Sequence, residues 1–231
     1  MKYIKISLLI FFAIITATAK AQYSTESDDK LLRFGFLLGF NSMDFDIENS
    51  LQNIDGKVYR AEVSDLRPGF SVGIITDLRI NRYFSLRTTP TLHFAERELV
   101  YKDLGNTESF RTVVGSVPLS IPLYLKYSAE RYGQMRPYLL LGGGTHIDIG
   151  RDNTLPVLLK PIDFFIEFGV GCEIYFSFFK LAPELKFALG QRNLLTSIAD
   201  RNLSVNQVES KYTDALSRLG SRLITLSFNF E

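Results

Sequence analysis

The chain has 231 residues, of which 46% are hydrophobic and 22% charged, and its formal net charge at pH 7 is +1. This balance provides no basic surface of the kind that nucleic-acid binding requires, so we expect no nucleic-acid partner. The single cysteine, Cys172, cannot form a disulfide within the chain. It is predicted to serve as a small apolar side chain.

Residues 1–21 have the features of a secretory signal peptide. Two lysines precede an apolar run over residues 6–17, which is short for a membrane-spanning helix, and residues 19–21 (AKA) form an A-x-A cleavage site. We expect cleavage after Ala21; the alternative is a retained anchor at this end. The remaining residues, 22–231, have the length of one domain. That segment contains 23 of the 26 Lys and Arg residues against 25 Asp and Glu, a net charge of −2.

Eight later segments alternate apolar and polar residues with a period of two, which is typical of β-strands with one apolar face. Their approximate ranges are 33–41, 70–80, 84–94, 117–128, 136–150, 164–174, 179–189 and 222–231. The apolar phase changes across "YFSF", residues 175–178. Such a change across a tight turn predicts a hairpin that keeps one apolar face continuous.

The connections between these segments alternate in length. Those after the second, fourth and sixth segments are short, whereas those after the first, third, fifth and seventh are long, over about 45–68, 97–113, 151–161 and 191–221. One end of the structure therefore has tight turns and the other has every long loop, as in outer-membrane barrels. We predict an all-β fold, an eight-stranded antiparallel transmembrane β-barrel with short periplasmic turns and long extracellular loops.

A soluble lipocalin-like barrel is the alternative fold, with its apolar face inside. Two features weigh against it. The polar face consists mainly of Gly, Ala, Ser and Thr, which would cover a water-facing surface poorly. Aromatic residues gather at the turn ends of the strands, where a membrane interface would place them. The polar face is therefore predicted to line the inside of the barrel.

Twelve charged side chains lie on this inward face. An eight-stranded lumen is just wide enough for side chains to fill it, and unpaired charges there would each cost several kcal/mol. We therefore expect a paired network that plugs the barrel. The predicted members are Arg33, Arg79, Arg87, Lys126, Lys180 and Lys186 with Asp77, Asp148, Asp163, Glu167, Glu173 and Glu184.

His93 and His146 are the only histidines, and both are predicted to point inward near the loop ends of their strands. His146-x-Asp148, with a Ser or Thr from another strand, is the nearest arrangement to a catalytic group, so a lipid-modifying outer-membrane enzyme is an alternative function. The sequence lacks a nucleophile elbow, a paired-His metal spacing and a Gly-rich phosphate loop. We expect structural histidines, with no catalytic, cofactor-binding or metal-binding residues.

The last long loop contains a predicted helix over residues 204–220. Ser204 and Gln207 are spaced as a capping box, and Gly220 would end the helix. An apolar stripe follows the helical period. It could pack on the barrel rim or dock a partner. The candidate docking residues are Val208, Tyr212, Leu216 and Leu219.

Segments along nearly the whole of residues 22–231 resemble the PorT family of Bacteroidetes outer-membrane β-barrels. The pieces "RPGF", "VPL…P" and "RPY" are shared by many related barrels, whereas "GFNSMDF" at 39–45 and "LRTTPTLHF" at 86–94 point to PorT itself. The resemblance implies a non-enzymatic component of the type IX protein secretion system, which exports proteins with C-terminal signal domains and is tied to gliding motility in some species. It implies no cofactor and no catalytic residues.

The same resemblance implies partners among other secretion-system proteins of the outer membrane and periplasm, together with outer-membrane lipid. A barrel filled by its own side chains would support or dock the export machinery and would not form its conduit. The remaining alternative is a generic structural or adhesion barrel.

Overall fold

The computed structural model describes residues 30–50, 53–54, 57–58, 60–63, 68–102, 108–150, 160–194 and 216–231. The predicted signal peptide, 1–21, lies outside the described residues. No helix within the described ranges is long and apolar enough to cross a membrane. The strands are β1 (Leu32–Asn49), β2 (Asn53–Ile54), β3 (Lys57–Val58), β4 (Arg60–Val63), β5 (Pro68–Arg79), β6 (Phe84–Thr88), β7 (Thr91–Lys102), β8 (Glu108–Ser116), β9 (Pro118–Ser128), β10 (Met135–Asp148), β11 (Ile162–Tyr175), β12 (Lys180–Gly190) and β13 (Leu216–Phe230).

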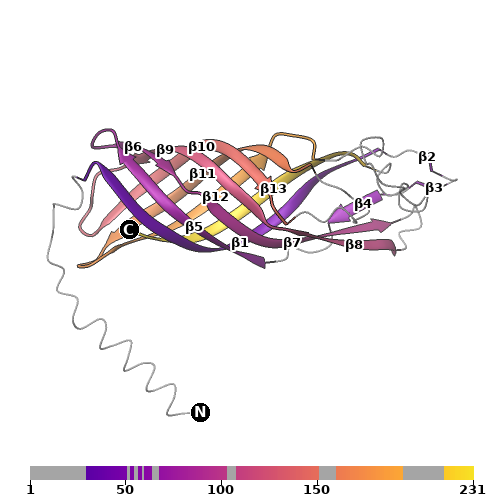
Figure 1. The fold of residues 1–231 in the computed structure, drawn as a ribbon, viewed down its shortest axis with the longest axis horizontal. Helices are drawn as coiled ribbons and strands as arrows, with labels where there is room; N and C mark the ends of the chain where they lie inside the picture. The colour runs from indigo at the N-terminus through magenta and orange to yellow at the C-terminus, as the bar shows by residue number, and fades with distance from the viewer. Residues whose placement is uncertain are drawn as a thin grey trace, which may run out of the picture.

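Antiparallel pairing closes most of these strands into a barrel, whereas β2 and β3 form a separate two-stranded sheet (Figure 1). The order is β1-β13-β12-β11-β10-β9-β6-β5, and β1 also pairs with β5, which completes the ring. Phe36 of β1 shows the closure, because it pairs with Phe230 on one side and with Ile74 on the other. When β6 and β7 are counted as one interrupted strand, the ring has eight strands. The predicted eight-stranded barrel is confirmed.

The third predicted strand is interrupted at Thr89 and Pro90, which separate β6 from β7. Pro90 has no N–H to donate to a neighbouring strand, but its carbonyl oxygen accepts a hydrogen bond from the N–H of Ile74 at 3.0 Å. A Cβ at Gly73 would lie 2.6 Å from the same oxygen. Gly73 therefore allows β5 to approach the bend closely.

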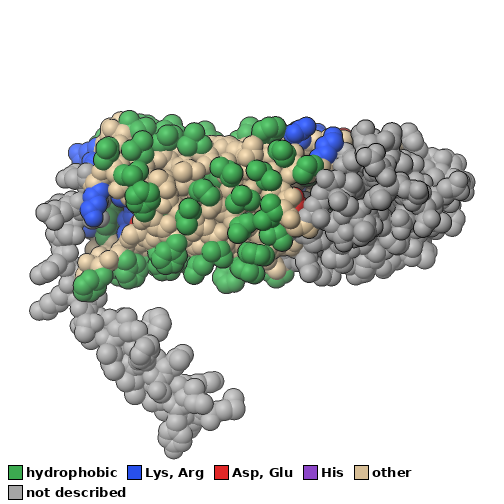
Figure 2. Space-filling model, in the orientation of Figure 1, with side chains coloured by type: hydrophobic (Ala, Val, Ile, Leu, Met, Phe, Trp, Pro, Cys, Tyr) green, Lys and Arg blue, Asp and Glu red, His purple; other side chains and the backbone are tan. Residues whose placement is uncertain are grey.

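The outer surface is apolar and the inner surface is polar, the reverse of a soluble protein. Figure 2 shows hydrophobic side chains over the described wall of the barrel, with Lys and Arg near its two ends. Phe34 and Ile74 are 66% and 62% exposed, whereas Glu173 and Lys126 are fully buried. An apolar surface this extensive is expected only in contact with another apolar phase. The strand phases predicted from the period of two are confirmed.

The connections lie as predicted at the short end, whereas strands extend into three of the four predicted long loops. Tight turns at 80–83, 129–134 and 176–179 share one end of the barrel with Glu231 (Figure 1). At the other end, β7 and β8 pair from Ala95↔Ser116 to Lys102↔Glu108, and β1 stays paired with β13 as far as Asn49↔Leu216. Beyond the membrane neither face of a strand must be apolar, so backbone pairing continues where the alternation of side chains has ended.

Candidate functional site

The lumen contains a closed ring of six alternating charges near the short-turn end. Asp77 accepts from Arg87 at 2.9 Å, and Arg87 pairs with Glu231 at 2.5 Å. Glu231 pairs with Lys180 at 2.5 Å, and Lys180 with Glu173 at 2.9 Å. Lys126 contacts Glu173 and lies 3.5 Å from Asp77, which closes the ring. These side chains come from β5, β6, β9, β11, β12 and the residue after β13, so the ring joins most of the barrel wall.

Further side chains form ion pairs and hydrogen bonds with members of this ring. Arg33 pairs with Asp77 at 3.1 Å, and the Tyr175 hydroxyl donates to Glu173 at 2.8 Å. Glu184 lies 3.5 Å from Arg87 and 3.4 Å from Lys186. Each charge in the ring therefore faces charges of opposite sign, the condition under which buried ions are tolerated.

Tyrosines form the next layer along the lumen. The Tyr138 hydroxyl donates to Glu184 at 2.7 Å, and the Lys126 ammonium lies 4.4 Å from the centre of the Tyr138 ring. The Tyr124 hydroxyl donates to Glu167 at 2.7 Å. Both tyrosines are almost wholly buried and pack with Leu140 and Ala182. The aromatic rings thus fill the space above the charges while their hydroxyls complete the polar contacts.

The two histidines lie deeper toward the long-loop end. His93 Nδ1 is 2.8 Å from Ser71 Oγ, and His146 Nδ1 is 2.6 Å from Ser120 Oγ. The two imidazole rings meet edge to face with centroids 6.3 Å apart, and His146 stacks on Phe165 at 3.9 Å. Beside them lies an apolar cluster of Met43, Ala95, Phe165, Ala188 and Leu223. These layers fill the described lumen with side chains from one end toward the other.

Three of the twelve predicted network residues lie apart from the ion pairs and tyrosine contacts described above. Arg79 is at the short-turn end, where its Nε donates to the carbonyl oxygen of Asn81 at 3.3 Å. Asp148 is at the long-loop end and accepts from the backbone N–H groups of Val117 and Gly150. Asp163 is buried and accepts from the Ser221 hydroxyl at 2.6 Å. The other nine, with Glu231, make the ion pairs and tyrosine contacts described above.

Glu231 is the ring member that the sequence analysis missed. Its signal was present, because 225, 227, 229 and 231 continue the inward phase of the last strand. Tyr175 also departs from the expectation that aromatic residues at the turn ends of the strands lie at the membrane interface, because it is 7% exposed and its hydroxyl donates to Glu173 inside the barrel. Tyr175 ends β11, and it keeps the inward phase of Glu173 because the phase change comes only after it.

The predicted helix is wrong at its end. Leu216 begins β13, and Leu219 is fully buried on the inner side of that strand. Leu219 pairs with Ile47 of β1, and its N–H donates to Asn193 Oδ1 at 3.1 Å. Backbone pairing with the long extension of β1 therefore stabilises a strand here in place of the helix that the local apolar period predicts. The other two docking candidates, Val208 and Tyr212, lie outside the described residues and stay predictions.

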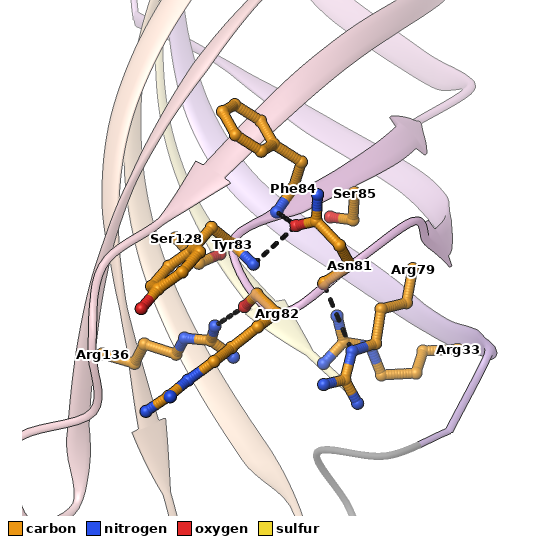
Figure 3. Close-up of a pocket in the computed structure, with 9 residues that line it drawn as sticks. All are labelled: Arg33, Arg79, Asn81, Arg82, Tyr83, Phe84, Ser85, Ser128 and Arg136. Carbon is orange, nitrogen blue, oxygen red and sulfur yellow. Dashed lines mark hydrogen bonds between the residues drawn. The ribbon is translucent and has the colours of Figure 1, made fainter.

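A basic depression opens at the short-turn mouth (Figure 3). Four arginines line it: Arg33, Arg79, Arg82 and Arg136. Arg136 Nε donates to the Ala129 carbonyl at 2.9 Å, and its Nη2 donates to the Arg82 carbonyl. Asn81 Oδ1 accepts from the N–H groups of Tyr83 and Phe84, both at 2.8 Å, and so fixes the turn.

The chemistry available in this arrangement is electrostatic and structural. Each Ser–His pair is buried among lumen side chains, with Ser71 1% and Ser120 3% exposed. His146 pairs in register with Asp163 of β11, yet Asp163 hydrogen-bonds to Ser221. Among the residues that the structure describes, no group of three His, Cys, Asp or Glu side chains could hold a metal ion.

A closed antiparallel barrel with an apolar wall and an ionic interior defines an outer-membrane protein. Residues 20–196 match the family described as "Outer membrane protein beta-barrel domain". The match covers most of the chain, and the chain belongs to this family and resides in the outer membrane. No curated protein shows significant sequence similarity to it.

Three solved structures are similar to this chain. Neisserial surface protein A (NspA) is 10% identical with a TM-score of 0.44, over 87% of this chain and 98% of that chain. OprG from Pseudomonas aeruginosa is 12% identical with a TM-score of 0.44, over 85% and 92%. Ail, the attachment invasion locus protein of Yersinia pestis, is 11% identical with a TM-score of 0.35, over 85% and 96%.

Proposed function

We propose that this protein is a non-enzymatic, PorT-like component of the type IX protein secretion system that supports or docks the export machinery without forming its conduit. The secretion role is supported by the resemblance of "GFNSMDF" and "LRTTPTLHF" to PorT. The supporting rather than conducting role has a separate basis, the closed charge ring inside the barrel.

The ring leaves no open path at its level. Arg87, Lys126 and Glu173 are fully buried, although they lie on the inner wall of a barrel. A passing polypeptide would have to separate at least one of these ion pairs and leave a buried charge without its partner, at a cost of about 3–5 kcal/mol each. Export through this lumen is therefore disfavoured, and the chain acts through its ends.

The partners of this role are other secretion-system proteins, reached from the outer membrane and from the periplasm, with outer-membrane lipid around the apolar wall. The long-loop end and the short-turn end are the two surfaces that protrude from the membrane. Loops carried by a rigid scaffold are common binding sites. The barrel thus serves as a rigid scaffold that holds the binding surfaces at its two ends.

A lipid-modifying activity is the competing function. The two Ser–His pairs are its only structural basis within the described residues, and they face the filled lumen, whereas lipid acyl chains contact the opposite face of the wall. A catalytic group must come within hydrogen-bond reach of its substrate. The burial of Ser71 and Ser120 therefore favours a structural role for both pairs.

The test is complementation of a deletion strain in the native host, with secretion of a cargo protein bearing a C-terminal signal domain as the readout. The wild-type gene and a His93→Gln/His146→Gln variant should both restore secretion, and crosslinking in the membrane should recover other secretion-system proteins. Normal cargo secretion by the deletion strain would refute the secretion role. Loss of complementation by a well-folded histidine variant would revive the enzymatic alternative.

A further inference from the structure

The basic depression at the short-turn mouth is lined by four arginines. It brings together guanidinium groups from the start of β1, the end of β5, the following turn and the start of β10 (Figure 3). Like charges gathered in one place repel one another, and the pairs of Arg33 with Asp77 and of Arg82 with Glu130 offset only part of that electrostatic cost. An anion seated among them would offset that cost.

Two buried polar atoms point to such a ligand. Ser85 lines the depression and is only 4% exposed, and its Oγ has no hydrogen-bond partner within the protein. Arg33 Nε is likewise buried without a partner, although Arg33 Nη2 is held by Asp77. A buried hydroxyl without a partner costs free energy unless something in the site accepts or donates a hydrogen bond. Both atoms can donate to an anion.

The volume of the depression limits how much of an anion can enter it. Its cavity volume is about 10 Å³, which is room for a group the size of one water molecule. A space of that size admits one oxygen of a carboxylate, and guanidinium groups around it match planar carboxylates in a bidentate manner. The rim already has one guanidinium–carboxylate pair, a single contact of 3.4 Å between Arg82 Nη2 and Glu130 Oε1.

We propose that this depression is a carboxylate-binding site for an acidic peptide segment of a periplasmic protein. Arg82 and Arg136 provide the outer donors, and Arg33 Nε and Ser85 Oγ provide the inner ones. The site opens at the end of the barrel that carries the short turns, so its ligand arrives from the periplasm. This inference goes beyond the proposed secretion role and does not depend on it.

The chain itself supplies a competing occupant. Glu26, Asp28 and Asp29 lie just before β1 in the sequence. The Leu31 carbonyl accepts from the N–H of Arg79, so Leu31 lies at the mouth, and residues 26–29 precede it in the sequence by only a few positions. The experiment must therefore separate binding of an external peptide from occupation by residues 26–29.

The probe is a fluorescent peptide with two adjacent glutamates, added to residues 22–231 folded in zwitterionic detergent micelles and followed by anisotropy. A matched peptide has glutamines at both positions. Ser85→Ala removes the inner hydroxyl, and Arg82→Gln removes an exposed outer charge. Arg222→Gln is the control, because it makes the same change of charge at the opposite end of the barrel, where Arg222 pairs with Asp46.

We expect the glutamate peptide to bind and the glutamine peptide not to bind. Ser85→Ala and Arg82→Gln should each weaken binding about tenfold, the scale of one lost charge-assisted hydrogen bond, and Arg222→Gln should leave it unchanged. Heat-modified gel mobility verifies folding, and the exposed position of Arg82 keeps the test valid if Ser85→Ala does not fold.

Other outcomes would overturn the proposal. Equal weakening by Arg222→Gln would show attraction to overall charge instead of a site. Displacement of the peptide by micellar phosphatidylglycerol, at concentrations where neutral lipid has no effect, would assign the site to lipid. Binding that is seen only after Glu26, Asp28 and Asp29 are neutralised would assign it to the chain itself.

Discussion

Arg87 Nε donates to Asp77 Oδ2 at 2.9 Å, and neither side chain has any exposed surface. The two residues are directly paired across β5 and β6, so this fully buried ion pair is set by the register of a hairpin with a four-residue turn. A slip of one residue in either strand would turn one of these charges toward lipid. The ion pair and the register therefore support each other.

Removing one charge of this pair should destabilise the barrel strongly. Arg87→Gln leaves Asp77 and Glu231 with fewer cations, and we expect a loss of about 3–5 kcal/mol in the free energy of unfolding. Urea titration followed by gel mobility of unheated samples measures it. Arg82→Gln, in a pair with both side chains 69% exposed, is the matched control and should cost less than about 1 kcal/mol. Equal effects of the two changes would contradict the buried ring.

Glu231 should matter as much as any residue inside a strand. Glu231→Gln keeps the shape of the side chain but removes the charge between Arg87 and Lys180. We expect a lower urea midpoint and slower refolding into micelles, because two buried cations lose a shared partner. Glu130→Gln, an exposed carboxylate at the same end of the barrel, is the comparison. A urea midpoint for Glu231→Gln equal to that of the wild type would remove Glu231 from the ring.

Cys172 reports which face of β11 meets lipid. It lies between the inward-facing Gly171 and Glu173 and pairs with Pro137 on β10. In intact membranes a lipid-soluble maleimide should modify Cys172, and a charged maleimide should not. A Cys172→Ser/Ser227→Cys variant, with its thiol at a fully buried lumen position, should react with neither reagent. Rapid modification of Cys172 by the charged reagent would reverse the inward and outward phases.

The wild-type protein should show no large, steady conductance in planar bilayers, since its lumen is filled by the ring and by the tyrosine layer. An open porin inserted under the same conditions is the positive control. A Tyr124→Ala/Tyr138→Ala variant should also remain closed, because the ring lies below that layer. Steady porin-like currents through the wild-type protein would refute the filled lumen and restore a conduit role.

The two histidines should affect stability more than function. His93→Gln and His146→Gln each remove a ring that is bonded to a serine, and His146 also loses its stack on Phe165. We expect each single variant to lose about 1–2 kcal/mol in urea titrations and to retain cargo secretion. A variant with wild-type stability and no secretion would instead indicate a direct functional role.

The strand period determined the class of fold from the sequence alone. Alternation such as Ile166-Glu167-Phe168 can satisfy one apolar and one polar face only in a strand, and the alternating lengths of the connections placed the turns at one end. The inward position of Glu167 and Lys186 followed from the same period, because phase is a local property of the backbone.

The tertiary structure decided which inward-facing charges pair with one another, which the strand period does not determine. Period shows that Asp77 and Lys180 face inward, but the choice of Arg87, Glu173 and Glu231 as their partners depends on how strands distant in sequence are wound around the lumen. Leu219 shows the same limit. Its local pattern fits a helix, yet backbone pairing with the extended β1 places it in β13. The local sequence determines which face of a strand each side chain occupies, whereas pairing between distant segments is set by closure of the barrel, which gives every strand of the ring a neighbour on both sides.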